Sequence, residues 1–388
     1  MSAQEYKLSP ACVQGSGFFG FFFWVNAMSC NHTSWIRLSK RDYEISLQVT
    51  DRPVRLLNDV YSTDNATPSL VLLVGNQHKA SALKTLGIDH RNPEGYRKHG
   101  DVHLSLVQPE RLQMSTQPLL LAECDVPKHN RLLPSCQRPR CHEVVEQALP
   151  ANRTRTRQAK ASHIADLVYH RLIFPFIDAL CLFVDDLGGL HDVARMLGAW
   201  LDQGEPSTSQ ALPSLILVSH DDLGSEALTC LEDLVQSETS VSLYSRYQHI
   251  SFITLSSWWH FRRSTKHRQW HWDSFREALE TSLQHARKVR SAESLLFSAT
   301  HFLSFLDCAA QGILARPTVF DFVQASRRHN PVNANLQTHL AEFLKGVQTV
   351  EALKTFAIPL LASTMILDHF PPGMHSQSPL HTLTRCFR

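Results

Sequence analysis

The residues best suited to chemistry lie between Leu70 and Leu83, where an apolar run leads into Gly75 and then a predicted helix. A phosphate-binding loop of the form GxxxxGK[ST] would occupy this position, with a second glycine to wrap the phosphate, a lysine and a magnesium-binding hydroxyl. Ala80 and Ser81 stand where the second glycine and the lysine belong, and Lys79 comes two residues early. Because a Cβ at Ala80 restricts positive φ angles, we expect nucleotide affinity to be weak or absent.

A second nucleotide-binding element would be a strand that ends in an acidic residue near magnesium. The apolar run from Pro118 to Cys124 ends suitably, but GTPases carry Asp-x-x-Gly at this strand end. Here the four positions hold Glu123, Cys124, Asp125 and Val126. If nucleotide binding survives, the candidate residues for weak Mg-GTP or Mg-ATP binding are Gly75, Lys79, Ser81, Glu123 and Asp125. Otherwise no cofactor is expected.

Two carboxylates and two glycines follow the apolar run at Ala179 to Val184, at the strand end where open α/β sheets bind ligands. Asp186 could equally cap the helix that begins near Leu190, and Gly188-Gly189 could form an ordinary β-to-α turn. The structural interpretation is favoured.

Metal and hydrolase motifs are incomplete. Cys136-x4-Cys141-His142 lacks the second ligand pair of a structural zinc site, so no metal ligand is assigned. The consecutive residues 219–221, Ser-His-Asp, cannot converge as a triad, and the chain has no Gly-x-Ser-x-Gly. No catalytic residue is assigned, which favours a protein that is not an enzyme.

The segment from Trp258 to Trp272 interleaves four tryptophans with four arginine or lysine residues. Such a segment could stack on single-stranded nucleic acid or contact a lipid headgroup. We favour a loop whose tryptophans cover a sheet edge, because a net charge of +2 provides no long-range attraction for nucleic acid or anionic lipid. Nucleic acid is therefore not expected as a partner, and membrane contact has no support.

These candidates must be positioned by a doubly wound α/β domain with a mostly parallel sheet. Five continuously apolar runs are typical of strands that are buried on both faces: Leu70–Val74, Pro118–Cys124, Ala179–Val184, Leu215–Ser219 and Ile250–Leu255. Helical spacing separates them, at Ser81–Gly87, Ile164–Ile173, Leu190–Leu201 and Ser225–Leu234.

The expected domain organisation has four parts. Residues 1–54 have no assignment, residues 55–285 form a P-loop-NTPase-like α/β domain with an exposed insertion at 127–160, residues 286–370 form a helical subdomain, and residues 371–388 form a loose tail. The helices expected in the C-terminal part are Phe275–Val289, Ala292–Ala309, Thr318–Arg328, Leu336–Lys345 and Val350–Leu367.

Composition indicates a globular protein in a reducing compartment. The chain has 388 residues, 43% hydrophobic and 19% charged, and its nine cysteines are scattered rather than paired. The apolar run from Gly17 to Met28 is shorter than the roughly 20 residues that span a bilayer. We therefore expect a cytoplasmic location and no transmembrane helix.

Several phrases resemble, in order, the N-terminal half of large fungal patatin-like phospholipases. They are DVHLSLVQPE, QPLLLAECDV, LVYHRLIFPFIDALCLFVDDLGGLHDVARMLGAWL, SLLFSATHFLSFL, FVQASRRHN and STMILDHFPPGMH, and the resemblance as a whole covers about residues 55 to 375. In that family a GTPase-like region and a helical region precede a patatin hydrolase domain. No lipase residue is transferred, because this chain has no matching position.

The resemblance implies a non-catalytic regulatory or interaction module whose nucleotide-binding motifs are eroded and which acts through protein or domain partners. Two alternatives stay open. One is a weak GTP- or ATP-binding switch domain. The other is a fragment of a patatin-like lipid acyl hydrolase whose catalytic domain is absent here.

Overall fold

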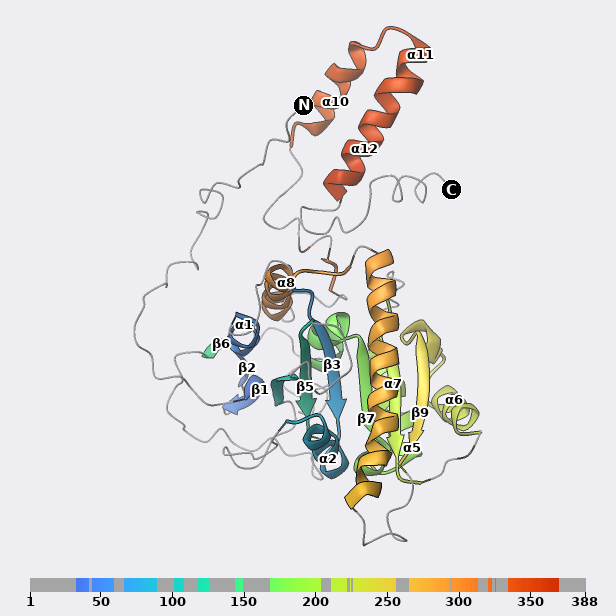
Figure 1. The fold of residues 1–388 in the computed structure, drawn as a ribbon. Coiled ribbons are helices and arrows are strands. Elements are labelled where there is room, and N and C mark those ends of the chain that lie inside the picture. Colours follow the sequence, from blue (N-terminus) through green and yellow to red (C-terminus); the bar gives the residue numbers. More distant parts are fainter. Residues whose placement is uncertain are drawn as a thin grey trace. The chain divides into compact units, whose positions relative to one another are not determined.

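The computed structural model of the chain describes residues 33–41, 44–58, 66–88, 101–107, 117–125, 144–148, 168–203, 211–221, 224, 226–255, 265–293, 295–312, 320–322, 325 and 334–369. Within these residues nine strands form one sheet in the order β6-β2-β1-β4-β5-β3-β7-β8-β9 (Figure 1). Strands and helices together make an α/β fold.

The strands are β1 (Ser34–Arg41), β2 (Glu44–Thr50), β3 (Ser69–Val74), β4 (Val102–Val107), β5 (Leu119–Cys124), β6 (Val144–Ala148), β7 (Ala179–Phe183), β8 (Ser214–Ser219) and β9 (His249–Thr254). The neighbours β5, β3, β7, β8 and β9 are parallel. These five strands confirm the five apolar runs. Every residue of β3, β5, β7 and β8 is buried, as expected of strands with helices on both faces.

The sheet extends beyond the predicted strands through an antiparallel part. β4 pairs with β5, β1 with β4, β2 with β1 and β6 with β2. The α/β domain therefore begins earlier than the expected boundary at residue 55, and β6 lies within the segment 127–160 that was expected to be an exposed insertion. The sequence pattern did not indicate β1, β2, β4 and β6 because polar residues interrupt their apolar runs, as is common in antiparallel sheets.

The α-helices are α1 (Arg52–Asn58), α2 (Gln77–Thr85), α4 (Val184–Leu187), α5 (Leu190–Gln203), α6 (Ala227–Glu238), α7 (Thr265–Ala292), α8 (Ala299–Gly312), α10 (Leu336–Lys345), α11 (Val350–Ala352) and α12 (Ile358–His369). Shorter helical turns of other types are η3 (Val168–Ile173), η4 (Phe174–Phe176), η5 (Leu243–Ser245) and η7 (Leu353–Ala357). The predicted helices at α5, α6 and α10 are confirmed. Among the described residues, no helix is both long and apolar enough to cross a membrane.

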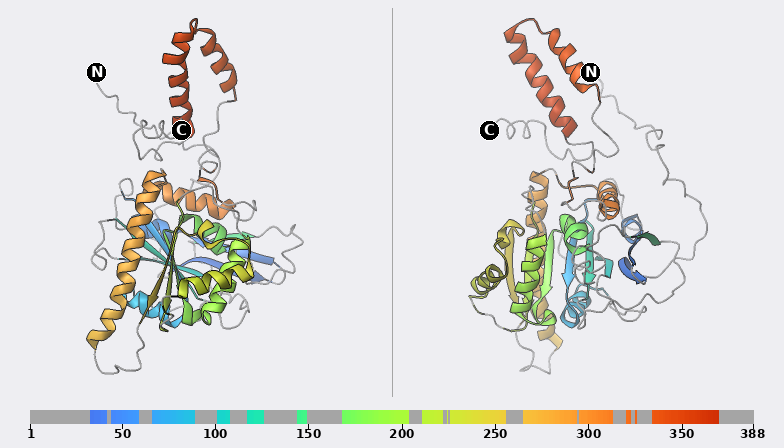
Figure 2. Two further views of the ribbon diagram at one scale, coloured as in Figure 1. Left: turned by 90° about the vertical axis from the view of Figure 1, so that its right-hand side faces the viewer. Right: turned by 180° about the vertical axis from the view of Figure 1, so that it is seen from behind.

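Alternate residues of the strands pack into two separate hydrophobic cores, one on each face of the sheet. On one face, Leu70 and Leu72 pack with side chains of α1, α5, α6 and α8. On the other face, Val71 and Leu73 pack with side chains of α2 and α7. The result is three layers, with α7 on the opposite face from α5 and α6 (Figure 2).

Helices α7 and α8 belong to this sheet domain, so the expected boundary at residue 286 is not where the packing changes. That position falls inside α7, which is a single helix. The ring of Phe302 on α8 lies 5.8 Å from that of Phe176, inside the core. The pattern suggested a boundary because strands end there, although the helices continue to cover the sheet.

Only parts of two other predicted segments are described. Trp272 is half-buried beside Phe275 on α7, with ring centroids 5.8 Å apart, while residues 256–264 and the side chains of 265–271 lie outside the described residues. The predicted helix Thr318–Arg328 is described only at residues 320–322 and 325. In the last helical segment, Phe343 of α10 and Phe356 of η7 have ring centroids 6.3 Å apart.

Candidate functional site

The chemistry-bearing residues gather at the carboxyl ends of the parallel strands. From β3 the chain runs through β4 to β5 on one side and later returns to β7 on the other, so β3 and β7 flank the point where the strand order reverses. Open α/β sheets bind ligands in the crevice at this point. Helix α2 follows β3 there, α4 follows β7, and His220 follows β8.

The amino end of α2 holds a carboxylate that belongs to the protein itself. Asp186 of α4 accepts hydrogen bonds from four successive backbone amides, at 2.7 Å from Asn76, 3.1 Å from Gln77, 2.9 Å from His78 and 3.1 Å from Lys79. Unpaired amides and the helix dipole make a helix amino end an anion site. Asp186 therefore occupies the kind of cradle in which a phosphate would sit.

The cradle is also smaller than a phosphate-binding loop. Helix α2 begins at Gln77, two residues after Gly75, whereas GxxxxGK[ST] places four residues between its glycines before the helix. At Gly75 a Cβ would lie 2.8 Å from Asp186 Oδ2 and 2.9 Å from Phe183 Cβ. Gly75 is therefore required by the close approach of Asp186 and Phe183.

Electrostatics favour the ionised form of Asp186. Burial alone would raise its pKa, but hydrogen bonds from the His78 ring and from the amides of Asn76, Lys79 and His78 outweigh burial and lower the pKa from 3.8 to about 2. The charge thus contributes stability that is present above about pH 4 and is lost as the pH falls towards 2. In return, the hydrogen bond to Asp186 raises the pKa of His78 against the opposing effect of burial.

Lys79 points away from the cradle and into a buried ionic network. Its side chain is 0% exposed, and its Nζ donates to the carbonyl of Cys124 at 2.9 Å and to Asp125. The carboxylate of Glu123, itself 3% exposed, lies 3.4 Å from the same nitrogen. This lysine therefore neutralises the acidic end of β5 instead of facing a ligand at the amino end of α2.

The predicted nucleotide-site residues fall into three groups. Lys79, Glu123 and Asp125 come together in the buried network, and Gly75 lies against Asp186. Ser81 is exposed, and its hydroxyl donates to the carbonyl of Gln77 one turn earlier in α2. The five predicted residues therefore do not converge on a common point, because Lys79 binds the acids of β5 and the Ser81 hydroxyl bonds within α2.

The sequence suggested that Asp186 could cap the helix that begins near Leu190, but the hydrogen bonds of its carboxylate go to another helix. Asp186 caps α2 instead, which lies about 110 positions earlier in the chain. Asp186 lies in the short helix α4, which directs its carboxylate towards the end of β3. Gly188 ends α4 in the left-handed conformation with φ of 101°. Local sequence could indicate a capping residue, but the choice of helix depends on the pairing of β3 with β7.

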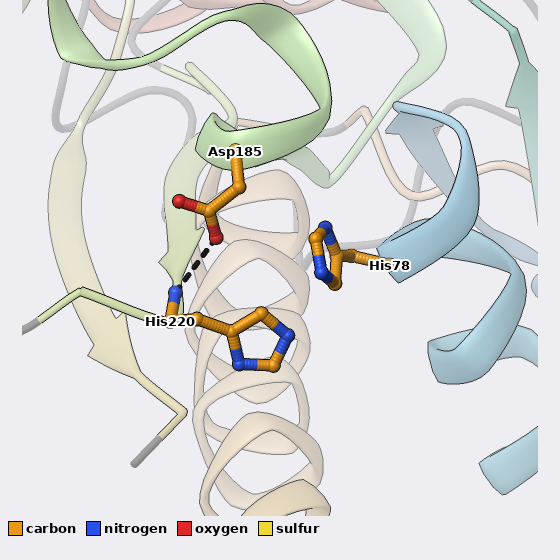
Figure 3. Close-up of side chains that lie close together, drawn as sticks. All are labelled: His78, Asp185 and His220. Atoms are coloured by element: carbon orange, nitrogen blue, oxygen red, sulfur yellow. Dashed lines mark hydrogen bonds between the residues drawn. The ribbon is translucent and has the colours of Figure 1, made fainter. Parts of the chain in front are cut away.

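Beside the cradle, His78, Asp185 and His220 form a cluster that sequence reasoning missed (Figure 3). One potential ligand atom from each lies within 4.8 Å of those of the other two. The residues come from α2, α4 and the end of β8, so no motif of fixed spacing marks them. Their shared position after three parallel strands was the one available signal.

No protein-family model and no curated protein sequence matches this chain.

Proposed function

We propose that this chain is a non-catalytic regulatory or interaction module, in which a GTPase-like sheet serves as a scaffold and Asp186 fills the phosphate cradle. The observation that carries the proposal is the donation of four successive amides, from Asn76 to Lys79, to this single carboxylate. The protein then acts through contacts with other proteins or domains and does not turn over nucleotide.

Competition at the cradle supports the proposal. A phosphate would have to displace a carboxylate that is tethered in place by the fold and loses no translational freedom on binding. The Asp186 side chain is only 5% exposed and also accepts from the ring of His78 at 3.0 Å. Displacing it would leave a buried charge without its hydrogen bonds, which is costly.

Local charge also disfavours a nucleotide. Among the described residues, five carboxylates lie at this edge, and Lys79 contacts two of them, Glu123 and Asp125. The other three belong to Asp185, Asp186 and Asp221. A nucleoside triphosphate is strongly anionic and would be repelled by the excess negative charge. Magnesium could offset part of this repulsion, but the lysine that normally contacts the β- and γ-phosphates is engaged elsewhere.

The strand order supports the GTPase-like part of the proposal. The six strands β4-β5-β3-β7-β8-β9, of which β4 alone is antiparallel, follow the order of GTPase-type P-loop domains. The filled cradle lies at the switch point of this order. Together with the resemblance to the N-terminal region of fungal patatin-like phospholipases, this favours a patatin-type hydrolase domain as the partner that the module regulates or positions.

Titration calorimetry with Mg-GTP and Mg-ATP tests the proposal. We expect no saturable heat from the wild type and none from Lys79→Ala. Saturable micromolar binding by the wild type that is lost in Lys79→Ala would overturn the proposal and support the nucleotide switch instead. Turnover of either nucleotide above the level of a Lys79→Ala, Glu123→Ala double variant would do the same.

Asp186→Ala provides the complementary test. Removing the tethered carboxylate leaves the amides of residues 76–79 to water, so this variant should bind inorganic phosphate more tightly than the wild type does. Asp221→Ala is the matched control, because Asp221 is exposed at the same edge. Equal phosphate affinity in wild type and Asp186→Ala would contradict the role assigned to Asp186.

A further inference from the structure

The cluster of His78, Asp185 and His220 has the composition and geometry of a metal site. The three side chains come from separate elements and are directed towards one another (Figure 3). The two imidazole rings meet edge to face, with centroids 4.3 Å apart. All three residues are half-buried, so an ion could reach them from solvent and keep a bound water.

Hydrogen bonds fix both imidazoles in the tautomer that a metal requires. His78 Nδ1 lies 3.0 Å from Asp186 Oδ1, and His220 Nδ1 lies 3.2 Å from the carbonyl oxygen of Leu255. Both partners are acceptors, so each Nδ1 carries the hydrogen and each neutral ring has its lone pair on Nε2. Metal-binding histidines characteristically donate their other nitrogen to a carboxylate or a backbone carbonyl in this way.

The third side chain is oriented equally well. Asp185 Oδ2 accepts from the backbone amide of His220 at 2.7 Å, and Oδ1 accepts from the hydroxyl of Ser219 at 3.2 Å. Each oxygen keeps a lone pair, because a carboxylate has about four acceptor positions. A ligating carboxylate is itself usually hydrogen-bonded, and Asp185 meets this condition.

We propose that His78, Asp185 and His220 bind one zinc ion. Imidazole and carboxylate suit zinc, and three protein ligands leave a fourth tetrahedral position for water. Zinc bonds of about 2.1 Å place tetrahedral ligand atoms roughly 3.4 Å apart, so atoms that lie within 4.8 Å of one another need to close by no more than about 1.4 Å when the ion binds. The inference rests on the side-chain geometry and does not depend on the proposed function.

The ion would act as a clamp at the carboxyl edge of the sheet. It would join the amino end of α2 to α4 and to the residue after β8. Its two positive charges would balance those of Asp185 and Asp186, the second of which is hydrogen-bonded to His78. Zinc would therefore also hold Asp186 in the cradle.

Zinc titration by calorimetry and by mass spectrometry under native conditions tests the site. Since 22 histidines and nine cysteines could bind additional ions, the readout is the number of tightly bound equivalents. We expect His78→Ala, Asp185→Ala and His220→Ala each to lose one equivalent, or to weaken that step at least 100-fold. His249→Ala should leave the number of tightly bound equivalents unchanged, because His249 is exposed at the start of β9, at the opposite end of the strands from the site.

Far-UV circular dichroism establishes that each variant is folded, and His220→Gln offers a polar replacement of similar size that removes the imidazole. If His78→Ala and His220→Gln are both folded and bind as many zinc equivalents as the wild type with equal affinity, the proposal is overturned.

Cobalt substitution tests the same site in the wild type without any variant. The first equivalent of Co²⁺ should give the visible bands of a tetrahedral ion with nitrogen and oxygen ligands and no thiolate charge-transfer band. If none of the tightly bound equivalents gives these bands, and thiolate bands alone are seen, the proposal is overturned.

Discussion

At the scale of single residues, Asp186 connects the two features of this edge. Its carboxylate caps α2 and also orients the ring of His78. Hydrogen bonds from a helix amino end to a carboxylate are among the stronger ones in proteins. The acceptor is ionised, and the helix dipole favours negative charge at that end. One carboxylate thereby closes the anion cradle and prepares a histidine as a metal ligand.

Replacing Asp186 should therefore destabilise the protein more than replacing a neighbouring exposed acid. We expect Asp186→Ala to lower the free energy of unfolding by about 2 kcal/mol, because the amides of the first turn of α2 lose their acceptor. Asp221→Ala should change it by less than about 0.5 kcal/mol. Urea denaturation measures both, and equal midpoints would show that the cap contributes nothing.

At the scale of elements, helix cover on both faces of the parallel strands decides which side chains solvent can reach. Cys124 on β5 and Cys181 on β7 are buried, whereas Cys230 on α6 is exposed. Burial raises the pKa of Cys124 to about 12 and also raises that of Cys181. Strands β5 and β7 thus hold their thiols neutral and out of contact with reagents.

Alkylation of the native protein should reproduce this difference. Iodoacetamide at pH 8 should modify Cys230 and leave Cys124 and Cys181 unmodified, because the thiolate is the reactive form and both thiols are buried. Peptide mapping by mass spectrometry separates the positions, and labelling in urea is the control that all three can react. Rapid native labelling of Cys181 would contradict the placement of β7 in the centre of the sheet.

At the scale of the whole molecule, α7 is joined to the sheet by a buried ion pair at the edge opposite the cradle. Arg290 Nε donates to Asp178 Oδ1 at 2.6 Å, and its Nη2 donates to the carbonyl of Ile177 at 2.9 Å. The other carboxylate oxygen of Asp178 accepts from the amide of Leu70 at 3.0 Å. Residues from α7, β3 and the start of β7 therefore meet at one junction, which makes α7 part of the sheet domain.

Breaking this junction should destabilise the whole domain. Arg290→Ala removes the cation that is hydrogen-bonded to the buried Asp178 carboxylate, and we expect a loss of about 3–5 kcal/mol in the free energy of unfolding. Lys288→Ala is the control, since Lys288 is exposed on the same helix and should have an effect below about 0.5 kcal/mol. If a separate subdomain instead began at residue 286, inside α7, Arg290→Ala would leave the unfolding of the sheet unchanged.

The sequence by itself determined the parallel strands and most of the helices around them. Continuous apolar runs such as Leu70–Val74 and helical spacing such as Leu190–Leu201 are local properties, and burial on two faces or one follows from them. The sequence also showed that the loop after Gly75 lacks its second glycine and lysine. These observations needed no knowledge of distant contacts.

Only the tertiary structure decided which side chains meet at this edge of the sheet. Asp186 meets Asn76, and His220 meets His78, because β3, β7 and β8 lie side by side in parallel register, so residues far apart in the chain end at one edge. Lys79 likewise contacts Asp125 because β3 pairs with β5. Strand order is set by the packing of the whole core, and spacing along the chain carries no record of it.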